Sequence, residues 1–188
     1  MIKIGITGSL ASGKTTASKI LSFRRGPLFS ADKAVKELYK NKHFKFLVSK
    51  KFRVKNNSLL KKSLKKLILK NKVNIKKLER IIHPLVRKKM KNFTSQNKNK
   101  KLLFYEIPLL IESKLMKNFN VLIFVKAKKK LRLKRFQLKN GNKKLFNLLN
   151  SKQLNDVKKI KFCDHVVVNE KNLNILKKNL LVIIGKYE

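Results

Sequence analysis

The feature that most constrains this chain is a stretch of eight residues near its start, Gly8 to Thr15, which reads G-S-L-A-S-G-K-T. It fits the pattern G-x-x-x-x-G-K-[ST] of a phosphate-binding P-loop. The apolar run 1–7 before it predicts a buried parallel strand, and residues 15–21 after it predict a helix. Strand, loop and helix in this order are the context that the motif requires. The alternative, a glycine turn with an exposed lysine, is therefore disfavoured.

The backbone N–H groups of such a loop, together with the start of the next helix, form an anion site. Lys14 is expected to bridge the β- and γ-phosphates of ATP as a catalytic residue, and the Thr15 hydroxyl to bind Mg²⁺. ATP and Mg²⁺ are thus the predicted cofactors. The residues predicted to bind the nucleotide are Gly8, Ser9, Leu10, Ala11, Ser12, Gly13, Lys14, Thr15 and Thr16.

Length and composition set the broad class. The chain has 188 residues, of which 43% are hydrophobic, and no apolar run is long enough to span a membrane. It starts directly with its first predicted strand, so we expect no signal peptide. Cys163 is the single cysteine, which excludes an internal disulfide and a cysteine-based metal cluster. We therefore expect a cytoplasmic protein that binds no membrane.

The net charge of +41, from 50 Lys and Arg against 9 Asp and Glu, would ordinarily suggest a nucleic-acid partner. However, the basic residues are spread over the whole length. The chain is also rich in residues with A/T-rich codons and poor in Gly (6), Pro (3) and Trp (0). Codon bias is the simpler explanation, so any binding of nucleic acid is expected to be nonspecific. The sequence predicts no oligomeric state.

Apolar runs alternate with helical patterns, which predicts an α/β protein with a parallel sheet. Between residues 41 and 96 the patterns are only helical, and Pro84 is expected to break or restart the helix that contains it. The predicted strands are 1–7, 28–30, 102–107, 120–125 and 165–168. The other predicted helical segments are 31–39, 128–139, 142–162 and 172–184.

Further motifs, in order along most of the chain, resemble the dephospho-CoA kinase family of the P-loop nucleotide and nucleoside kinases. The motifs that carry this resemblance are I-G-I-T-G at 4–8, F-S-A-D at 29–32, I-H-P-L-V-R at 82–87, E-I-P-L-L-I-E-S at 106–113, and Gln153, Leu154, Lys159, Asp164 and Asn169. The resemblance implies a three-layer P-loop kinase fold. It also implies one domain, 1–188, with its core at 1–40, 100–135 and 162–188, a helical acceptor-binding insertion at about 41–99 and a helical lid at about 136–161.

The activity that the resemblance implies is transfer of the ATP γ-phosphoryl group to the ribose 3′-hydroxyl of dephospho-CoA, the last step of coenzyme A biosynthesis. Asp32 follows the second strand and is expected to be the catalytic base. From position alone, a helix N-cap explains Asp32 equally well. Ser30 replaces the first aspartate of the family's D-A-D stretch, so this role rests on Asp32. The residues expected to bind substrate are Thr7, Asp32, His83, Arg87 and Glu106.

Several of these residues have a structural alternative. Thr7 either touches substrate or satisfies backbone groups, and His83 is either a ligand or a packed helix residue. Glu106 is expected to hold Mg²⁺ through water or to orient Lys14. Glu112 either does the same or starts a helix. Cys163 is assigned no chemistry.

Arg132, Arg135 and Lys139 recur at three- and four-residue spacing, so they are predicted to share one helix face. Arg132 is predicted to be solvated. Arg135 matches a family lid arginine and is expected to be catalytic. Lys139 replaces a second lid arginine, and a third falls near Leu149. Two other classes remain as alternatives, another P-loop small-molecule kinase and a nucleic-acid-binding P-loop ATPase.

Overall fold

The computed structural model describes residues 1–71 and 73–188, which divide into two compact units. The first unit contains residues 1–30 and 97–188, and the second contains residues 31–96. The predicted arrangement, one domain with an insertion at about 41–99 and a lid at about 136–161, stays a prediction. Among the described helices, none is both long and apolar enough to cross a membrane.

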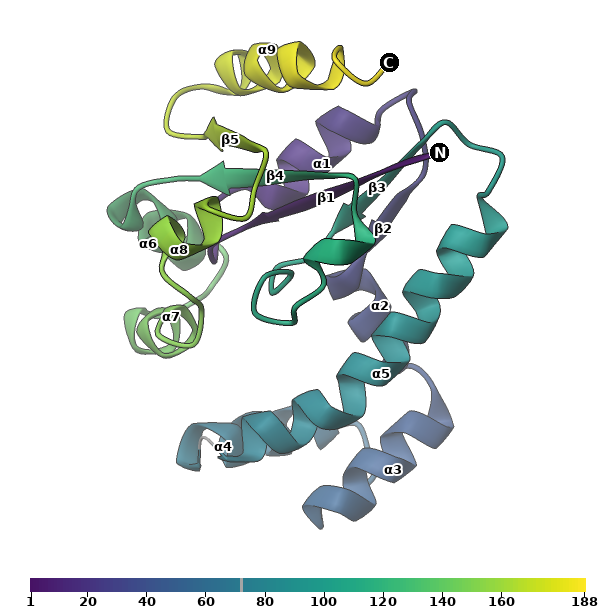
Figure 1. Ribbon diagram of the computed structural model, residues 1–188. Coiled ribbons are helices and arrows are strands. Elements are labelled where there is room, and N and C mark those ends of the chain that lie inside the picture. The colour runs from purple at the N-terminus through teal and green to yellow at the C-terminus, as the bar shows by residue number, and fades with distance from the viewer. Residues whose placement is uncertain (72) are drawn as a thin grey trace. The chain divides into compact units, whose positions relative to one another are not determined.

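The first unit is built on a parallel sheet of five strands in the order β2-β3-β1-β4-β5 (Figure 1). The strands are β1 (Ile2–Gly8), β2 (Leu28–Ser30), β3 (Leu102–Glu106), β4 (Val121–Lys126) and β5 (His165–Val168). The central strands are apolar nearly throughout, as strands covered on both faces must be. The predicted α/β class with a parallel sheet is confirmed, and the bounds of each predicted strand lie within one residue of the observed ones.

Two helices, α1 (Lys14–Ser22) and α9 (Leu173–Ile184), pack with the sheet into one apolar core. The buried residues of this core are Ile4, Ile6, Ala17, Leu21, Leu102, Phe104, Val121, Ile123, Val125, Val167, Leu176, Leu180 and Ile184. Full burial of each large side chain stabilises the fold by roughly 1.5–3 kcal/mol. This burial stabilises the sheet from whose strand ends the loops start.

Parallel strands end at a common edge, and here β1 lies between β3 and β4. The loop after β1 therefore emerges at the middle of the carboxyl edge, where open α/β sheets bind their ligands. Glu106 ends β3 at the same edge, and its register partner on β2 is Ser30. The remaining helices of this unit are η1 (Met116–Asn118), α6 (Lys129–Gln137), α7 (Lys143–Asn150) and α8 (Asp156–Ile160).

Two boundaries in this region differ from the prediction. The helix predicted over 128–139 ends at Gln137, because Asn140 takes a left-handed conformation and closes a turn with Gly141. The segment predicted as helical over 142–162 forms two short helices. The break occurs because the Asn155 side chain accepts the Val157 N–H and starts α8 afresh.

The second unit is helical throughout its regular structure and contains α2 (Ala31–Leu38), α3 (Lys42–Phe52), α4 (Leu60–Lys70) and α5 (Val73–Gln96). Its core consists of Leu38, Phe44, Val48, Leu60 and Leu64, against which the apolar stripe of α5 packs. An exposed ion pair between Lys89 and Glu37 joins α5 to α2, with Nζ and Oε2 2.6 Å apart. The hydrogen bond from Lys89 lowers the pKa of Glu37.

The expectation that Pro84 breaks or restarts its helix is wrong, because α5 continues through it. A proline inside a helix costs about 3 kcal/mol, since one hydrogen bond is lost and the ring crowds the preceding turn. Apolar residues on both sides of Pro84, including Ile81, Ile82, Leu85 and Val86, pack against the same core. Their common burial outweighs that cost, and Pro84 itself lies on the exposed side.

Candidate phosphate-binding site

The loop between β1 and α1 has a backbone that requires glycine at both ends. Gly8 and Gly13 have φ of 151° and 99°, in the region that side chains disfavour. A Cβ on Gly8 would lie 2.4 Å from the carbonyl oxygen of Val125, and a Cβ on Gly13 would lie 2.1 Å from Nδ2 of Asn169. The two glycines of the motif are therefore fixed by steric contacts as well as by backbone conformation.

Gly13→Ala is accordingly expected to be poorly tolerated. The new methyl group has to displace Asn169 while the backbone stays in a strained region, which costs roughly 1–3 kcal/mol of stability. Thermal unfolding with and without ATP measures this, and we expect both a lower Tm and a smaller shift by ATP. Gly185→Ala is the matched control, because its Cβ meets nothing nearer than Leu181 O at 3.4 Å. Equal Tm values for the two variants would contradict this account of the loop.

Lys14 is the first residue of α1, and its side chain folds back over the loop. Its Nζ donates a hydrogen bond of 2.9 Å to the carbonyl oxygen of Ser9, and only 8% of the residue is exposed. The start of α1 adds backbone N–H groups and the positive end of the helix dipole at the same place. This combination of a buried lysine and the positive end of a helix is suited to binding a polyphosphate.

Thr15 and Glu106 lie together at the same edge of the sheet. The Thr15 hydroxyl donates a hydrogen bond of 2.5 Å to Oε1 of Glu106, which is 3% exposed. A hydroxyl and a carboxylate are the hard oxygen ligands that Mg²⁺ prefers, and Mg²⁺ usually takes few protein ligands beside phosphate and water. The described residues contain no group of three or more His, Cys, Asp or Glu side chains that would form a metal cage. The residues present therefore fit a phosphate-bound Mg²⁺.

Arg132 is buried, so the prediction that it is solvated is wrong. It is 6% exposed, and its guanidinium donates to three oxygens, those of Ala127 (3.1 Å), Leu10 (3.3 Å) and the Asn150 side chain (2.8 Å). Burial lowers the pKa of Arg132, and the nearby charge of Asp156 opposes that shift. Its planar fork of donors explains how one cation satisfies three separate acceptors. Arg132, a residue of α6, thus holds Leu10 at the tip of the P-loop.

Arg135 and Asn169 meet at the opposite end of the loop. Both donate to the carbonyl oxygen of Ser12, Arg135 over 3.3 Å and Asn169 over 2.8 Å, and Arg135 also reaches Oδ1 of Asn169 over 3.5 Å. Lys139 lies in the exposed turn beyond the end of α6, so the three basic residues do not share one helix face. The structure brings Arg135, but not Lys139, to the P-loop by its hydrogen bonds.

Two side chains from the segment around α8 also contact the tip of the P-loop, at Ser9 and Leu10. Gln153 Oε1 accepts the N–H of Leu10 over 2.9 Å, and the Asp156 carboxylate accepts the Ser9 hydroxyl. No motif or pattern in the sequence singles out Asp156 or Asn150. Gln153 and Asn169 belonged to the C-terminal pattern of the resemblance, which was the signal that could have identified them as loop contacts.

The other predicted residues of the first unit have structural partners. The buried Thr7 hydroxyl donates to the carbonyl oxygen of Pro108 over 3.2 Å, which favours the backbone alternative. Glu112 pairs with Lys159, with Oε1 and Nζ 2.7 Å apart. Burial raises the pKa of Cys163 to about 11, so at neutral pH the thiol is protonated and a poor nucleophile.

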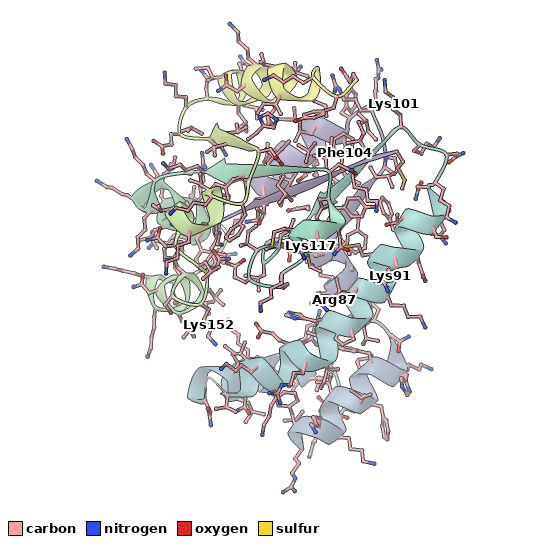
Figure 2. All side chains as sticks on the ribbon, viewed as in Figure 1. Arg87, Lys91, Lys101, Phe104, Lys117 and Lys152 are labelled. Atoms are coloured by element: carbon pink, nitrogen blue, oxygen red, sulfur yellow. The ribbon has the colours of Figure 1, made fainter. Side chains whose placement is uncertain are left out.

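Three predicted site residues belong to the second unit. Asp32 is exposed in the first turn of α2, and because α2 begins at Ala31 it is not the N-cap. His83 and Arg87 lie one turn apart on α5, where Figure 2 labels Arg87. Figure 2 also shows side chains that end in nitrogen on helices of both units. This is expected, because the basic residues are spread over the whole sequence. The roles of Asp32, His83 and Arg87 toward substrate stay predictions.

The sequence and the fold are similar to those of known proteins. Residues 2–174 match a family model described as dephospho-CoA kinase. A dephospho-CoA kinase of Bartonella quintana is 34% identical over 96% of this chain and 95% of its own length. One from Fusobacterium nucleatum is 32% identical over 94% of each chain.

Several solved structures superimpose on nearly the whole chain. A dephospho-CoA kinase from Campylobacter jejuni superimposes with a TM-score of 0.66 and 26% identity, covering 99% of this chain and 97% of that one. A Thermus thermophilus protein superimposes with a TM-score of 0.82 and 25% identity, covering 100% and 98%. A shikimate kinase from Bacteroides thetaiotaomicron, at 11% identity and a TM-score of 0.55, shares the fold alone.

Proposed function

The chain belongs to the dephospho-CoA kinase family, and from this premise we propose which of its residues carry out the reaction. It is an ATP-dependent kinase that transfers the γ-phosphoryl group to the ribose 3′-hydroxyl of dephospho-CoA, giving coenzyme A and ADP. The observation that carries this proposal is the arrangement of the P-loop, residues 8–15. The Lys14 side chain folds back over the loop to Ser9, and the Thr15 hydroxyl contacts Glu106.

Phosphoryl transfer requires positioning of the two substrates, neutralisation of the phosphate charge and removal of the hydroxyl proton. Different residues are proposed to meet each requirement. The loop amides and Lys14 bind the phosphates. Thr15 and Glu106 would hold Mg²⁺, which neutralises phosphate charge when bound. Asp32 follows β2 by two residues and accepts the proton of the acceptor hydroxyl. His83 and Arg87 bind the acceptor, Arg87 by pairing with one of its phosphates.

Arg135 is proposed to contact the transferring phosphoryl group. Its guanidinium already lies against the carbonyl oxygen of Ser12, in the loop that would bind the nucleotide. Developing charge on the phosphoryl oxygens would attract it more strongly in the transition state than in the ground state.

Arg135→Ala is therefore expected to lower kcat far more than it weakens ATP binding, by on the order of 10²-fold against a few-fold. Lys139→Ala should have a smaller effect, because Lys139 is exposed in the turn after α6. Steady-state kinetics of both variants, with ATP affinity from calorimetry, measure the difference. Small, equal effects that moderate salt abolishes would show that both are merely solvated charges.

The product itself tests the proposed reaction. We expect ³¹P and ¹H NMR of the purified product to place the new phosphate on the ribose 3′-oxygen of dephospho-CoA. Phosphorylation of another hydroxyl, or ADP release without a phosphorylated acceptor, would contradict the proposal. A cytoplasmic location and nonspecific binding of nucleic acid are proposed from the sequence alone.

A further inference from the structure

The side chain of Lys159, in α8, is fully buried at 0% exposure. Its Nζ lies 2.7 Å from Oε1 of Glu112, a residue of the loop after β3. Among the described residues, neither Nζ of Lys159 nor Oε2 of Glu112 has a hydrogen-bond partner, so the contact between the two side chains is an ion pair. A buried ammonium group is tolerated only beside a compensating charge. Glu112 is thus the residue that permits the burial of Lys159.

The same carboxylate oxygen also receives a backbone hydrogen bond. The N–H of Leu154 donates to Oε1 of Glu112 over 3.1 Å. Leu154 lies just before α8 and Lys159 lies near its end. One carboxylate therefore fixes both ends of a six-residue segment, 154–159.

This segment is the part of the chain that reaches the P-loop tip. Gln153, next to Leu154, accepts the Leu10 N–H, and Asp156 accepts the Ser9 hydroxyl. The carbonyl oxygen of Ser9 in turn accepts a hydrogen bond from Nζ of Lys14. Contacts thus run without a gap from Glu112 through the segment to Lys14.

We propose that the ion pair of Glu112 and Lys159 is a positioning device for the P-loop. It holds Gln153 and Asp156 against Leu10 and Ser9, and so fixes the loop and Lys14 in the geometry that binds the ATP phosphates. Neither Glu112 nor Lys159 touches the reacting atoms. This inference rests on the proposed function only in that the loop binds ATP.

A double-mutant cycle tests the inference with Lys159→Met, Gln153→Ala and the combination. Lys159→Met should lower both Tm and kcat, the latter roughly 10- to 100-fold, because small misplacements of catalytic groups have large effects. Gln153→Ala should lower kcat with little change in Tm. If both act through the same contact, the combination should have a kcat close to that of the slower single variant, and the KM for dephospho-CoA should stay unchanged.

Two outcomes would overturn the inference. One is a Lys159→Met variant with lower Tm and unchanged kcat, which would make the pair merely stabilising. The other is a combined loss of kcat equal to the product of the single losses. If Lys159→Met alone fails to fold, the cycle is run in the Glu112→Gln background, where no charge is left buried and an amide oxygen still faces Leu154.

Arg25→Met is the matched control, since Arg25 forms an ion pair with Glu188 in the same unit, before β2 and away from the carboxyl edge. Its kcat should equal that of the unchanged protein. Calorimetric ATP binding without any acceptor repeats the cycle independently of the reaction. Non-additive losses of ATP affinity would support the positioning role even if dephospho-CoA were not the acceptor, and additive losses would overturn it.

Discussion

Replacing Lys14 by alanine is expected to lower kcat by on the order of 10²–10³ while the fold stays intact. Lys14 is 8% exposed, and its ammonium group lies over the loop, where a polyphosphate would bind. During transfer, negative charge shifts among the phosphate oxygens, and a fixed cation at this place stabilises the transition state. Steady-state ADP release under saturating ATP and dephospho-CoA measures the effect.

Lys19→Ala is the control for this prediction, because Lys19 is an exposed lysine in the last turn of the same helix, α1. Its removal changes the net charge by the same amount and should leave kcat unchanged. A Lys14→Ala variant with near-normal turnover would mean that this loop is not where the phosphates react.

The second large effect is expected from Asp32→Asn, with a kcat lower by roughly 10²–10⁴ and ATP still bound. Asparagine keeps the size of the side chain but cannot accept a proton at neutral pH. A purely structural Asp32 would act through its place in the first turn of α2, where a carboxylate interacts favourably with the helix dipole. That contribution is about 0.3–1 kcal/mol, so the structural alternative predicts a small change in Tm and normal turnover.

Measuring Tm and kcat on the same preparation separates these alternatives. Glu37→Gln is the matched control, since it neutralises an exposed carboxylate of the same helix and breaks only a surface ion pair with Lys89. Such pairs contribute about 0–1 kcal/mol, and kcat should not change. Normal kcat in Asp32→Asn would rule out its role as the general base.

Local patterns in the sequence predicted most of the fold. The apolar run before Gly8 and the helical pattern after it are short-range signals, and β1, the P-loop and α1 lie where those signals place them. Such short-range signals could not predict that α5 continues through Pro84. Whether a helix continues through a proline depends on the apolar burial on both sides, and that burial is a property of the packed core.

The candidate site could be predicted only in part, for the same reason. Lys14, Thr15 and Glu106 follow from strand ends and a contiguous motif. The side chains that hold the loop are more than one hundred residues away from it in the sequence: Arg132 and Gln153 contact Leu10, and Asn169 contacts Ser12. Single lysines and arginines in a chain with 50 basic residues carry little signal, so the burial of Arg132 and Lys159 became visible only in the structure.

The measurement that tests the account most directly is ADP release by the unmodified protein, followed in a coupled assay with one acceptor at a time. Dephospho-CoA, a panel of nucleosides and RNA are compared at physiological salt with MgATP. We expect rapid, saturable ADP release with dephospho-CoA and only background rates with the nucleosides and RNA. Background rates with dephospho-CoA together with hydrolysis stimulated by RNA or a nucleoside would contradict the assignment as a dephospho-CoA kinase.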